Sequence, residues 1–566
     1  MPALLVSSAC SESQQEQAAT QSAANWAELA LVNGGIYTVD AKRSWAEAAA
    51  VRGGEFLSIG SNAEIEPLIG PQTRVIDLAG QMALPGFHDA HVHAVDGGFA
   101  LMGCVLRNSD SVEAIIQKVT DCALDKDQGW LEARAFEMTL FGPQGPHKSL
   151  LDAISIVRPI VLWASDYHNV WANSVALELA GITAETPDPP GGVIERNPDG
   201  SPSGTLRESA QELLLAAMPK PKLEVRIEAL RKGLEHLNSL GVTSYIEGWV
   251  VLDDYRSYQL LDQAGELSAR VVTSLPYETV FGEHRGDEFW QVLGERKRFE
   301  SNRLNHDSVK LFLDGVLEGE TAALIEPYHG KIGQRGELMF ESEALNAAVT
   351  RFDAMGLQVQ MHAIGDRAVR AGLDALESAR EQNGVTDNRH HIVHLQLVHA
   401  DDVERFAALD ATANFQALWA FPDEYITQLN LPALGQERVN GMYPIASILQ
   451  AGGRIVGGSD WDVSSANPLD AIEVAVRRQD PDKADGPVLN ENERLSLAAM
   501  IEAYTINAAW LMHHENITGS IEVGKRADIV VLDRNLFDIP VTEINEAQVV
   551  ETLLDGETVW ATPTAE

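Results

Sequence analysis

Residues 84–93, with the sequence LPGFHDAHVH, hold the side chains of this 566-residue chain that are best suited to chemistry. His91 and His93 are two residues apart, so in a β-strand both point to one face, as does Asp89. Neutral imidazoles at this spacing suit a borderline-soft divalent cation such as zinc. The segment therefore predicts a metal site, and metal-assisted hydrolysis is the leading interpretation. Two histidines that only pack or face solvent are the alternative.

Further ligand-type side chains stand at the ends of apolar segments downstream. Lys310 lies within SVKLFLDG, residues 308–315, where a buried lysine needs a partner. One interpretation pairs it with Asp314. Another makes it a neutral amine that takes up carbon dioxide, which gives an anionic carbamate able to bridge two metals. The remaining positions of this kind are His362, His394 and Asp460.

Strands that alternate with amphipathic helices through the middle of the chain predict a parallel βα architecture. The clearest unit has a strand at 357–363 and a helix at 367–383 that ends at Gly384. Another has a helix near 223–240 followed by a strand at 241–246. The predicted fold is an α/β (β/α)8 TIM barrel, in which the C-terminal strand ends meet at one site. All the ligand-type residues named above are expected to converge there.

A small β-sandwich built from both chain ends is expected beside the barrel, from residues 26–83 and 516–566. An Asn33-Gly34-Gly35 turn is expected between the first two strands, which is typical of a hairpin. Near the other end, 519–521 is strand-like and Asp555-Gly556 marks a second hairpin turn.

The barrel is assigned to residues 84–515. Within it, turn-rich stretches between about 110 and 221 predict an insertion that lies over the barrel mouth as a lid.

A net charge of −41 repels nucleic acid and anionic membrane surfaces, so nucleic acid is not expected as a partner. No apolar run is long enough to span a bilayer. The three cysteines, Cys10, Cys104 and Cys122, are too few for a disulfide framework. Cys104 and Cys122 are interpreted as buried packing residues. The sequence is compatible with a homo-oligomer.

The first 25 residues resemble a bacterial lipoprotein signal and tether. A short apolar run ends in small residues before Cys10, and the stretch 11–25 is polar and rich in Gln, Ala and Ser. This predicts a cell-envelope location, periplasmic or anchored through lipidated Cys10. Because no Lys or Arg precedes the apolar run and Leu is not three residues before Cys10, a disordered tail on a cytoplasmic protein is the alternative.

Taken together, the motifs resemble amidohydrolase family 3 of the amidohydrolase superfamily, in the YtcJ-like branch that includes N-substituted formamide deformylase. The resemblance extends from about Ala30 to Val559. The matching segments are 31–40, 84–93, 166–182, 191–208, 309–315, 362–368, 457–460 and 519–533.

The resemblance implies one or two divalent metals, zinc in preference to others. By motif, the more buried metal takes His91 and His93 with Asp460 close by, the second takes His362 and His394, and Lys310 bridges the two as a carbamate.

The implied activity is hydrolysis of a non-peptide, amide-like carbon–nitrogen bond in a small molecule. Metal-activated hydroxide attacks the carbonyl, and Asp460 carries the proton to the leaving nitrogen. His168, in the family motif 166–169, either contacts the substrate or holds the insertion in place. Two alternatives remain: the same centre acting on an ester, a lactone or a dipeptide-like amide, and a non-catalytic binding or regulatory protein on this scaffold.

Two positions depart from the family pattern. Val393 precedes His394 where relatives often carry Glu, which removes a partner for the imidazole. The run Glu318-Gly319-Glu320-Thr321 stands where relatives often have a Gly-Ser-Arg-Thr-like run. It exchanges a positive for a negative charge near the expected pocket, which favours neutral or cationic substrates.

Overall fold

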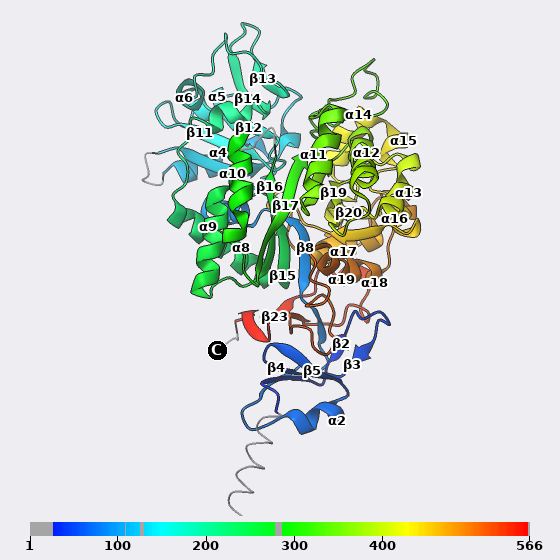
Figure 1. Cartoon of the computed structure of the whole chain (residues 1–566). Coiled ribbons are helices and arrows are strands. Elements are labelled where there is room, and N and C mark those ends of the chain that lie inside the picture. Colours follow the sequence, from blue (N-terminus) through cyan, green and yellow to red (C-terminus); the bar gives the residue numbers. More distant parts are fainter. Residues whose placement is uncertain (1–25, 108, 125–128, 278–285, 564–566) are drawn as a thin grey trace, which may run out of the picture.

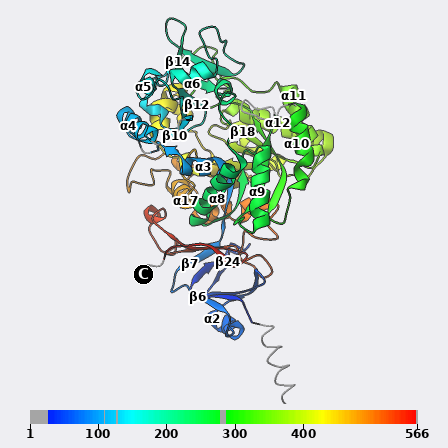
Figure 2. The ribbon, with the colours of Figure 1, turned by 90° about the vertical axis from the view of Figure 1, so that its left-hand side faces the viewer.

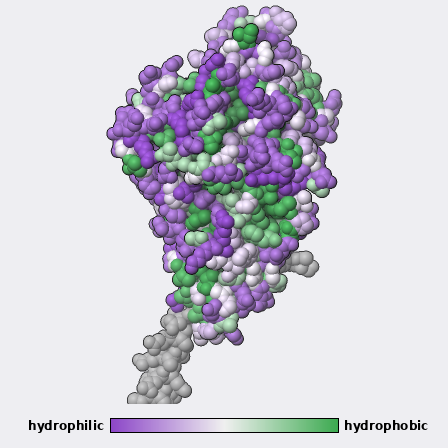
Figure 3. Space-filling view, turned by 90° about the vertical axis from the view of Figure 1, so that its right-hand side faces the viewer, coloured by the Kyte–Doolittle hydropathy of each residue, from purple (hydrophilic) through white to green (hydrophobic). Residues whose placement is uncertain are grey.

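The computed structural model describes residues 26–107, 109–124, 129–277 and 286–563 (Figure 1). The signal and tether predicted for residues 1–25, with Cys10, lie outside these ranges. In the described part, no helix has both the length and the apolarity to cross a membrane. Figure 3 shows one face of the molecule on which hydrophilic residues predominate between smaller hydrophobic patches. That face fits a solvated surface for a chain of high net charge.

Eight parallel strands form the central sheet and confirm the predicted barrel. The last strand meets the first just beyond its end, where the Asp460 backbone N–H donates to the His91 carbonyl at 2.8 Å. The His93 N–H donates to the Trp461 carbonyl at 2.7 Å, which closes the ring. In spatial order, the strands are β8 (Phe87–Val92), β15 (Val242–Glu247), β16 (Arg270–Pro276), β17 (Leu304–Phe312), β18 (Gln358–Ala363), β19 (His391–His394), β20 (Thr412–Phe415) and β21 (Arg454–Gly457).

Helices surround the barrel, so its strands are buried on both faces and consist largely of apolar residues (Figures 1 and 2). The helix predicted at 367–383 is α12 (Asp366–Asn383); its Val369, Leu373 and Leu376 are buried, and Gly384 follows at φ 85°. The other main helices are α3 (Ala94–Met102), α8 (Leu223–Ser239), α9 (Leu252–Ala264), α10 (Asp287–Glu295), α11 (Ser342–Ala354), α13 (Ala400–Leu409), α16 (Ile445–Gln450), α17 (Pro468–Arg477), α18 (Leu497–Ala503) and α19 (Ile506–Leu511).

Below the barrel lie two further sheets, one of them shared by both ends of the chain (Figure 1). The four-stranded sheet has the order β5 (Glu55–Gly60), β4 (Ala48–Arg52), β1 (Leu29–Val32), β6 (Arg74–Asp77). The six-stranded sheet has the order β24 (Glu557–Ala561), β23 (Val549–Leu554), β22 (Ile529–Leu532), β7 (Met82–Pro85), β2 (Gly35–Tyr37), β3 (Trp45–Ala46). The antiparallel pairing of β22 with β7 joins residues more than 440 positions apart.

Two local predictions in this region were wrong. β1 and β2 form no hairpin, because β1 pairs with β4 and β6 whereas β2 pairs with β3 and β7. Asn33, with φ 58°, carries the chain from one sheet to the other. Residues 519–521 form no strand; the Ile521 N–H donates to the Thr38 carbonyl at 2.8 Å. The Asp555-Gly556 hairpin is confirmed, since it joins β23 to antiparallel β24.

A buried ion pair ties the two-ended sheet to the base of the barrel. Arg270, the first residue of β16, donates to both oxygens of Asp528 at 2.9 and 3.1 Å. Arg270 also contacts Asp555 in the β23–β24 turn. Both Arg270 and Asp528 are buried away from solvent. Each side chain must therefore neutralise the charge of the other. The contact fixes the sheet at the end of the barrel opposite to its C-terminal strand ends.

The region between barrel strands β8 and β15 contains a sheet of its own, at the top of Figure 1. Its order is β13 (Gly192–Arg196), β14 (Pro202–Glu208), β12 (Asn169–Ala172), β11 (Ile160–Ala164), β10 (Leu131–Phe136) and β9 (Cys104–Val105). Figures 1 and 2 place this sheet and the two-ended sheet at opposite ends of the barrel. The insertion, which was predicted from its turn-rich sequence, therefore has a hydrophobic core of its own, built around Trp171 and Phe136.

Cys104 and Cys122 pack in or against this core, as expected, and they are also joined by a disulfide that was not predicted from the sequence. The bond connects β9 to α4 (Val112–Ala123), which packs on this sheet. A separation of 18 residues between the two cysteines does not by itself predict a disulfide. The two sulfurs meet because the hydrophobic face of α4, with Ile115 and Val119, is buried against the strands.

Candidate metal centre and active-site pocket

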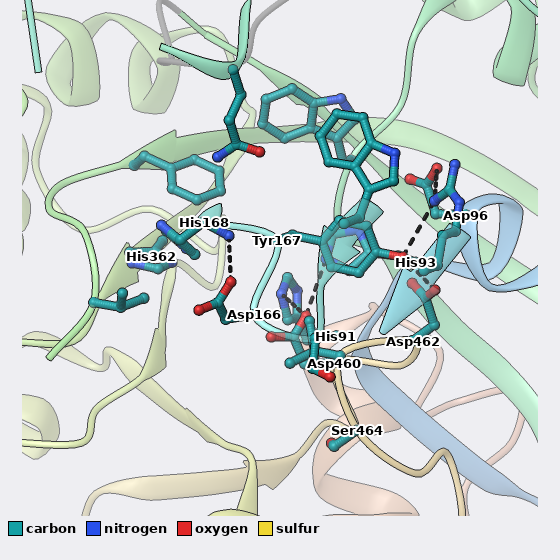
Figure 4. A pocket seen from close by; sticks show the side chains of 18 of the residues that line it. His91, His93, Asp96, Asp166, Tyr167, His168, His362, Asp460, Asp462 and Ser464 are labelled. Carbon is teal, nitrogen blue, oxygen red and sulfur yellow. Dashed lines mark hydrogen bonds and ion pairs between the residues drawn. The ribbon is translucent and has the colours of Figure 1, made fainter. Parts of the chain in front are cut away.

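The C-terminal end of the barrel brings four of the predicted ligands together. His91 Nε2 and His93 Nε2 lie 3.2 and 3.1 Å from Asp460 Oδ1, and His394 Nδ1 lies 3.8 Å from Asp460 Oδ2. Single donor atoms of His91, His394 and Asp460 all lie within 4.8 Å of one another. Imidazole nitrogens and a carboxylate at such distances fit a divalent cation. Figure 4 shows His91 and Asp460 at the base of this group.

Side-chain amides orient two of these histidines. Gln360 in β18 places its amide 2.7 Å from His91 Nδ1, and His394 Nδ1 donates to Gln416 Oε1 at 2.7 Å. Gln416 thus supplies the partner that Val393 does not. Burial keeps the pKa of His91 and of His394 well below the usual histidine value. Both rings are therefore neutral, which is the form that binds metal.

The backbone is in an uncommon conformation at two of these positions. His394 has φ 83° and Asp460 has φ 54°, which is the left-handed region that residues with a Cβ rarely adopt. Each residue comes at or just after the end of its strand, β19 and β21. Such conformations persist where the surroundings hold them, and they gather at functional sites.

Asp89 shares the strand face of His91 but acts as a structural link. Its Oδ1 accepts the backbone N–H groups of His91 and Ser459, each at 3.0 Å. Burial raises the pKa of Asp89 to about 7. The carboxyl group joins the end of β8 to the loop after β21, which carries Asp460.

Lys310 and His362 border the four-residue group. Lys310 Nζ is buried and lies 4.9 Å from the Phe312 ring centre; burial lowers the pKa of Lys310 to about 7 against the pull of Asp460. The His362 ring lies 4.5 Å from that of His394. The alternative that pairs Lys310 with Asp314 is wrong, since Asp314 accepts the backbone N–H groups of Ala323, Ile364 and Gly365 at 2.8 to 3.0 Å.

The insertion contributes His168 to the same pocket. Its Nδ1 lies 2.7 Å from Glu208 Oε2, and Glu208 Oε1 accepts the Thr321 hydroxyl at 2.7 Å. Burial lowers the pKa of His168, but the Glu208 charge outweighs burial and raises it to about 9. The His168 ring lies 5.7 Å from that of His362. The histidine therefore faces the barrel centre while Glu208 anchors it to the insertion.

Sequence reasoning missed Glu247, the last residue of β15. Its carboxylate accepts the Ala94 N–H at 2.9 Å and the Tyr258 hydroxyl at 2.7 Å, and lies 3.9 Å from His93 Nδ1. Burial raises the pKa of Glu247 to about 8. The available signal resembled that for Lys310: an ionisable residue in an otherwise apolar strand.

A cavity of about 650 Å³ opens above these residues. Barrel strand ends line one side, with the stacked pair His394 and Trp419, whose rings lie 5.7 Å apart at 4°. The insertion lines the other side, where the Tyr167 hydroxyl donates to Asp462 at 2.5 Å (Figure 4). A cavity of this size between two subdomains encloses a small molecule.

The histidine and carboxylate donors lie at the C-terminal strand ends of a (β/α)8 barrel. Barrel enzymes with a metal centre have this arrangement. The family model for amidohydrolases matches residues 74–560, and the chain belongs to this family. The resemblance of its motifs to the amidohydrolases is thereby confirmed, and the chain is a hydrolase of that family.

Two relatives and one solved structure cover most of the chain. Protein LONG AFTER FAR-RED 3 of Arabidopsis thaliana is 31% identical over 556 residues, or 94% of this chain and 92% of that protein. N-substituted formamide deformylase of Arthrobacter pascens is 29% identical over 549 residues, or 94% and 97%. An uncharacterised metal-dependent hydrolase from Pyrococcus horikoshii has a TM-score of 0.73 at 25% identity, over 91% of this chain and 99% of that one.

Proposed function

We propose that this protein hydrolyses the carbon–nitrogen bond of a small N-substituted amide at a centre of one or two divalent metals, zinc first among them. The observation that carries the proposal is the convergence of His91, His93 and His394 on Asp460 at the floor of the cavity. The similarity to a formamide deformylase along nearly the whole chain supports an amide as the substrate.

The donor set fits such a centre. His91, His93 and Asp460 would hold one metal; His362 and His394 would hold a second, with Lys310 as the bridging carbamate. Bound there, a divalent metal polarises the substrate carbonyl and lowers the pKa of a water to about 7.

Residues of the chain itself transfer the proton and position the substrate. Asp460 takes the proton of the attacking water and returns it to the leaving nitrogen as the carbon–nitrogen bond breaks. His168, anchored by Glu208, faces the cavity and donates a hydrogen bond to the carbonyl oxygen as negative charge develops there. The insertion covers the cavity and limits the access of bulk water.

A matched pair of substrates tests the reaction class. Zinc-loaded protein is given N-butylformamide and butyl formate, and formate release is measured. We expect release from the amide with a kcat/KM of at least about 10⁴ M⁻¹ s⁻¹, an ordinary value for an enzyme, and none from chelator-stripped protein. Formate from the ester alone would favour an esterase. No release from any N-acyl amide in a wider set would favour a binding protein.

We further propose that the protein is exported to the cell envelope and held by its N-terminal segment. The Cys104–Cys122 pair supports this, because disulfides persist in oxidising compartments. Cells are acid-quenched, and the denatured protein is alkylated before and after reduction. We expect both thiols to react only after reduction, and reduction to remove about 3 kcal/mol of stability from the insertion, given a loop of this length. Alkylation without reductant would place the protein in a reducing compartment.

A further inference from the structure

We propose that the outer part of the cavity binds an organic cation, an ammonium or guanidinium group at the far end of the substrate. The inference rests on the proposed function and deepens it by naming the substrate class. Three carboxylates and two amides form this subsite, called here the acidic subsite: Glu137, Glu318, Asp423, Gln396 and Asn430.

The three carboxylates have only neutral partners. Glu137 accepts the hydroxyls of Ser165 at 2.8 Å and Tyr425 at 2.6 Å. Glu318 accepts the Asn430 side-chain N–H at 3.1 Å, and Asp423 accepts the Ile426 backbone N–H at 2.8 Å. Within the described ranges, no Lys, Arg or His nitrogen lies within 4.0 Å of these carboxylates. No cationic side chain of the described residues therefore forms a direct ion pair with the subsite, and the His168 charge, which is paired with Glu208, acts on Glu318 only from a greater distance.

Cationic side chains nearby are committed elsewhere. Arg226 pairs with Asp254 at 2.7 Å. Arg134 lies 3.6 Å from Asp96 and donates to the Tyr167 hydroxyl at 3.2 Å. Neither arginine therefore forms an ion pair with the acidic subsite.

The three carboxylates also repel one another. Burial, together with the charges of Glu318 and Glu137, raises the pKa of Asp423 to about 7. Burial also raises the pKa of Glu318, together with the charge of Asp166. Like charges gathered in a partly buried pocket are unfavourable until a cation enters, so binding a cation relieves the repulsion.

Two buried amide oxygens independently indicate a ligand with N–H groups. Asn430 is 1% exposed and Gln396 is 6% exposed, yet Oδ1 of Asn430 and Oε1 of Gln396 have no hydrogen-bond partner in the described structure. Both residues line the cavity. Buried acceptors are normally satisfied, and an ammonium or guanidinium supplies three to five N–H donors. A neutral apolar group would leave these oxygens unpaired.

The subsite lies beside the reacting end of the cavity. The Glu318 charge acts on His168, whose ring lies 5.7 Å from that of His362 (Figure 4). A linear substrate can therefore place its amide at the metal centre and its cationic end among the carboxylates. The substrate class is then an N-acyl derivative of a diamine or of a guanidino amine, and hydrolysis releases the free amine with both cationic groups.

Three substrates of similar length test the charge preference. They are N-(4-aminobutyl)formamide, a cation; N-pentylformamide, which is neutral; and 4-formamidobutanoate, an anion. We expect kcat/KM to be at least about 10-fold higher for the cation than for the neutral compound, since one ion pair out of water contributes about 1.4 kcal/mol or more, and lowest for the anion. Equal values for all three would overturn the proposal.

Matched variants test whether the preference for a cationic substrate comes from the acidic subsite. Glu318→Gln and Asp423→Asn keep size and hydrogen bonding, and each should lower the ratio of kcat/KM for the cation to kcat/KM for the neutral compound about 10-fold. The controls are Glu320→Gln, two residues away and paired with Lys331, and exposed Glu424→Gln, next to Asp423. Controls that lose as much cation selectivity as the test variants would contradict a specific subsite.

A binding measurement separates this proposal from the hydrolytic one. Calorimetry with 1,4-diaminobutane and with 1-butanol needs no turnover. Diamine binding that Glu318→Gln weakens, in a protein with unchanged melting temperature, supports the subsite even if no formamide is cleaved. Formamide turnover without diamine binding would overturn the subsite and leave the proposed function intact.

Discussion

Replacing Asp460 with asparagine should lower kcat by about 10²- to 10⁴-fold, the range for loss of a general acid–base group, while metal content stays near the wild-type level. The asparagine side chain keeps an oxygen near His91 and His93, so the donor group still assembles. It cannot take up the proton of the attacking water or deliver one to the leaving nitrogen. Turnover of N-butylformamide and elemental mass spectrometry on the same sample measure both quantities.

Asp470→Asn is the matched control, because it makes the same chemical change in the same chain segment. Asp470 accepts the Ser465 hydroxyl and the Asn467 amide, away from the histidine group. It should leave kcat and metal content unchanged. If Asp460→Asn keeps both its metal and its turnover, Asp460 does not move the proton. If it loses its metal, Asp460 acts first as a ligand.

The convergence of the candidate ligands could be predicted from sequence because the position of each depends on local information. The period of a strand places His91 and His93 on one face, and the barrel brings strand ends together whatever lies between them. The partners that orient them could not be found in this way. Gln360 and Gln416 are common polar residues, and only the neighbouring positions of β18, β19 and β20 give them a role.

Errors arose where local turn chemistry competes with sheet assembly. Asn33-Gly34-Gly35 suits a hairpin, yet β2 pairs with β7, and β7 pairs with β22 from the far end of the chain. Such long-range pairing determines the strand register, and a short stretch of sequence does not contain both partner strands. The Cys104–Cys122 bond was missed for the same reason, since it depends on how α4 packs on β9 and β10.

Replacing Lys310 with alanine should remove one of two bound metals and lower kcat/KM by about 10³-fold, which corresponds to about 4 kcal/mol of metal-derived transition-state stabilisation. Lys310 is buried, and within the described residues no carboxylate pairs with its Nζ. A buried lysine without an anion is satisfied if its amine adds to carbon dioxide, forming N–COO⁻ and releasing a proton. The carbamate would supply anionic oxygen ligands for metals held by the histidines.

Chemical rescue distinguishes this role from a structural one. The cavity left by Lys310→Ala admits a short carboxylate, so added propionate should restore part of the activity and the second metal, whereas propionamide should not. In wild-type protein, ¹³C-bicarbonate should give a carbamate signal in the ¹³C spectrum that is absent from the variant. Lys232→Ala on the surface, where Lys232 pairs with Glu235, controls for loss of a lysine. Two metals and full activity in Lys310→Ala would make Lys310 a packing residue and leave the metals to the histidines and Asp460.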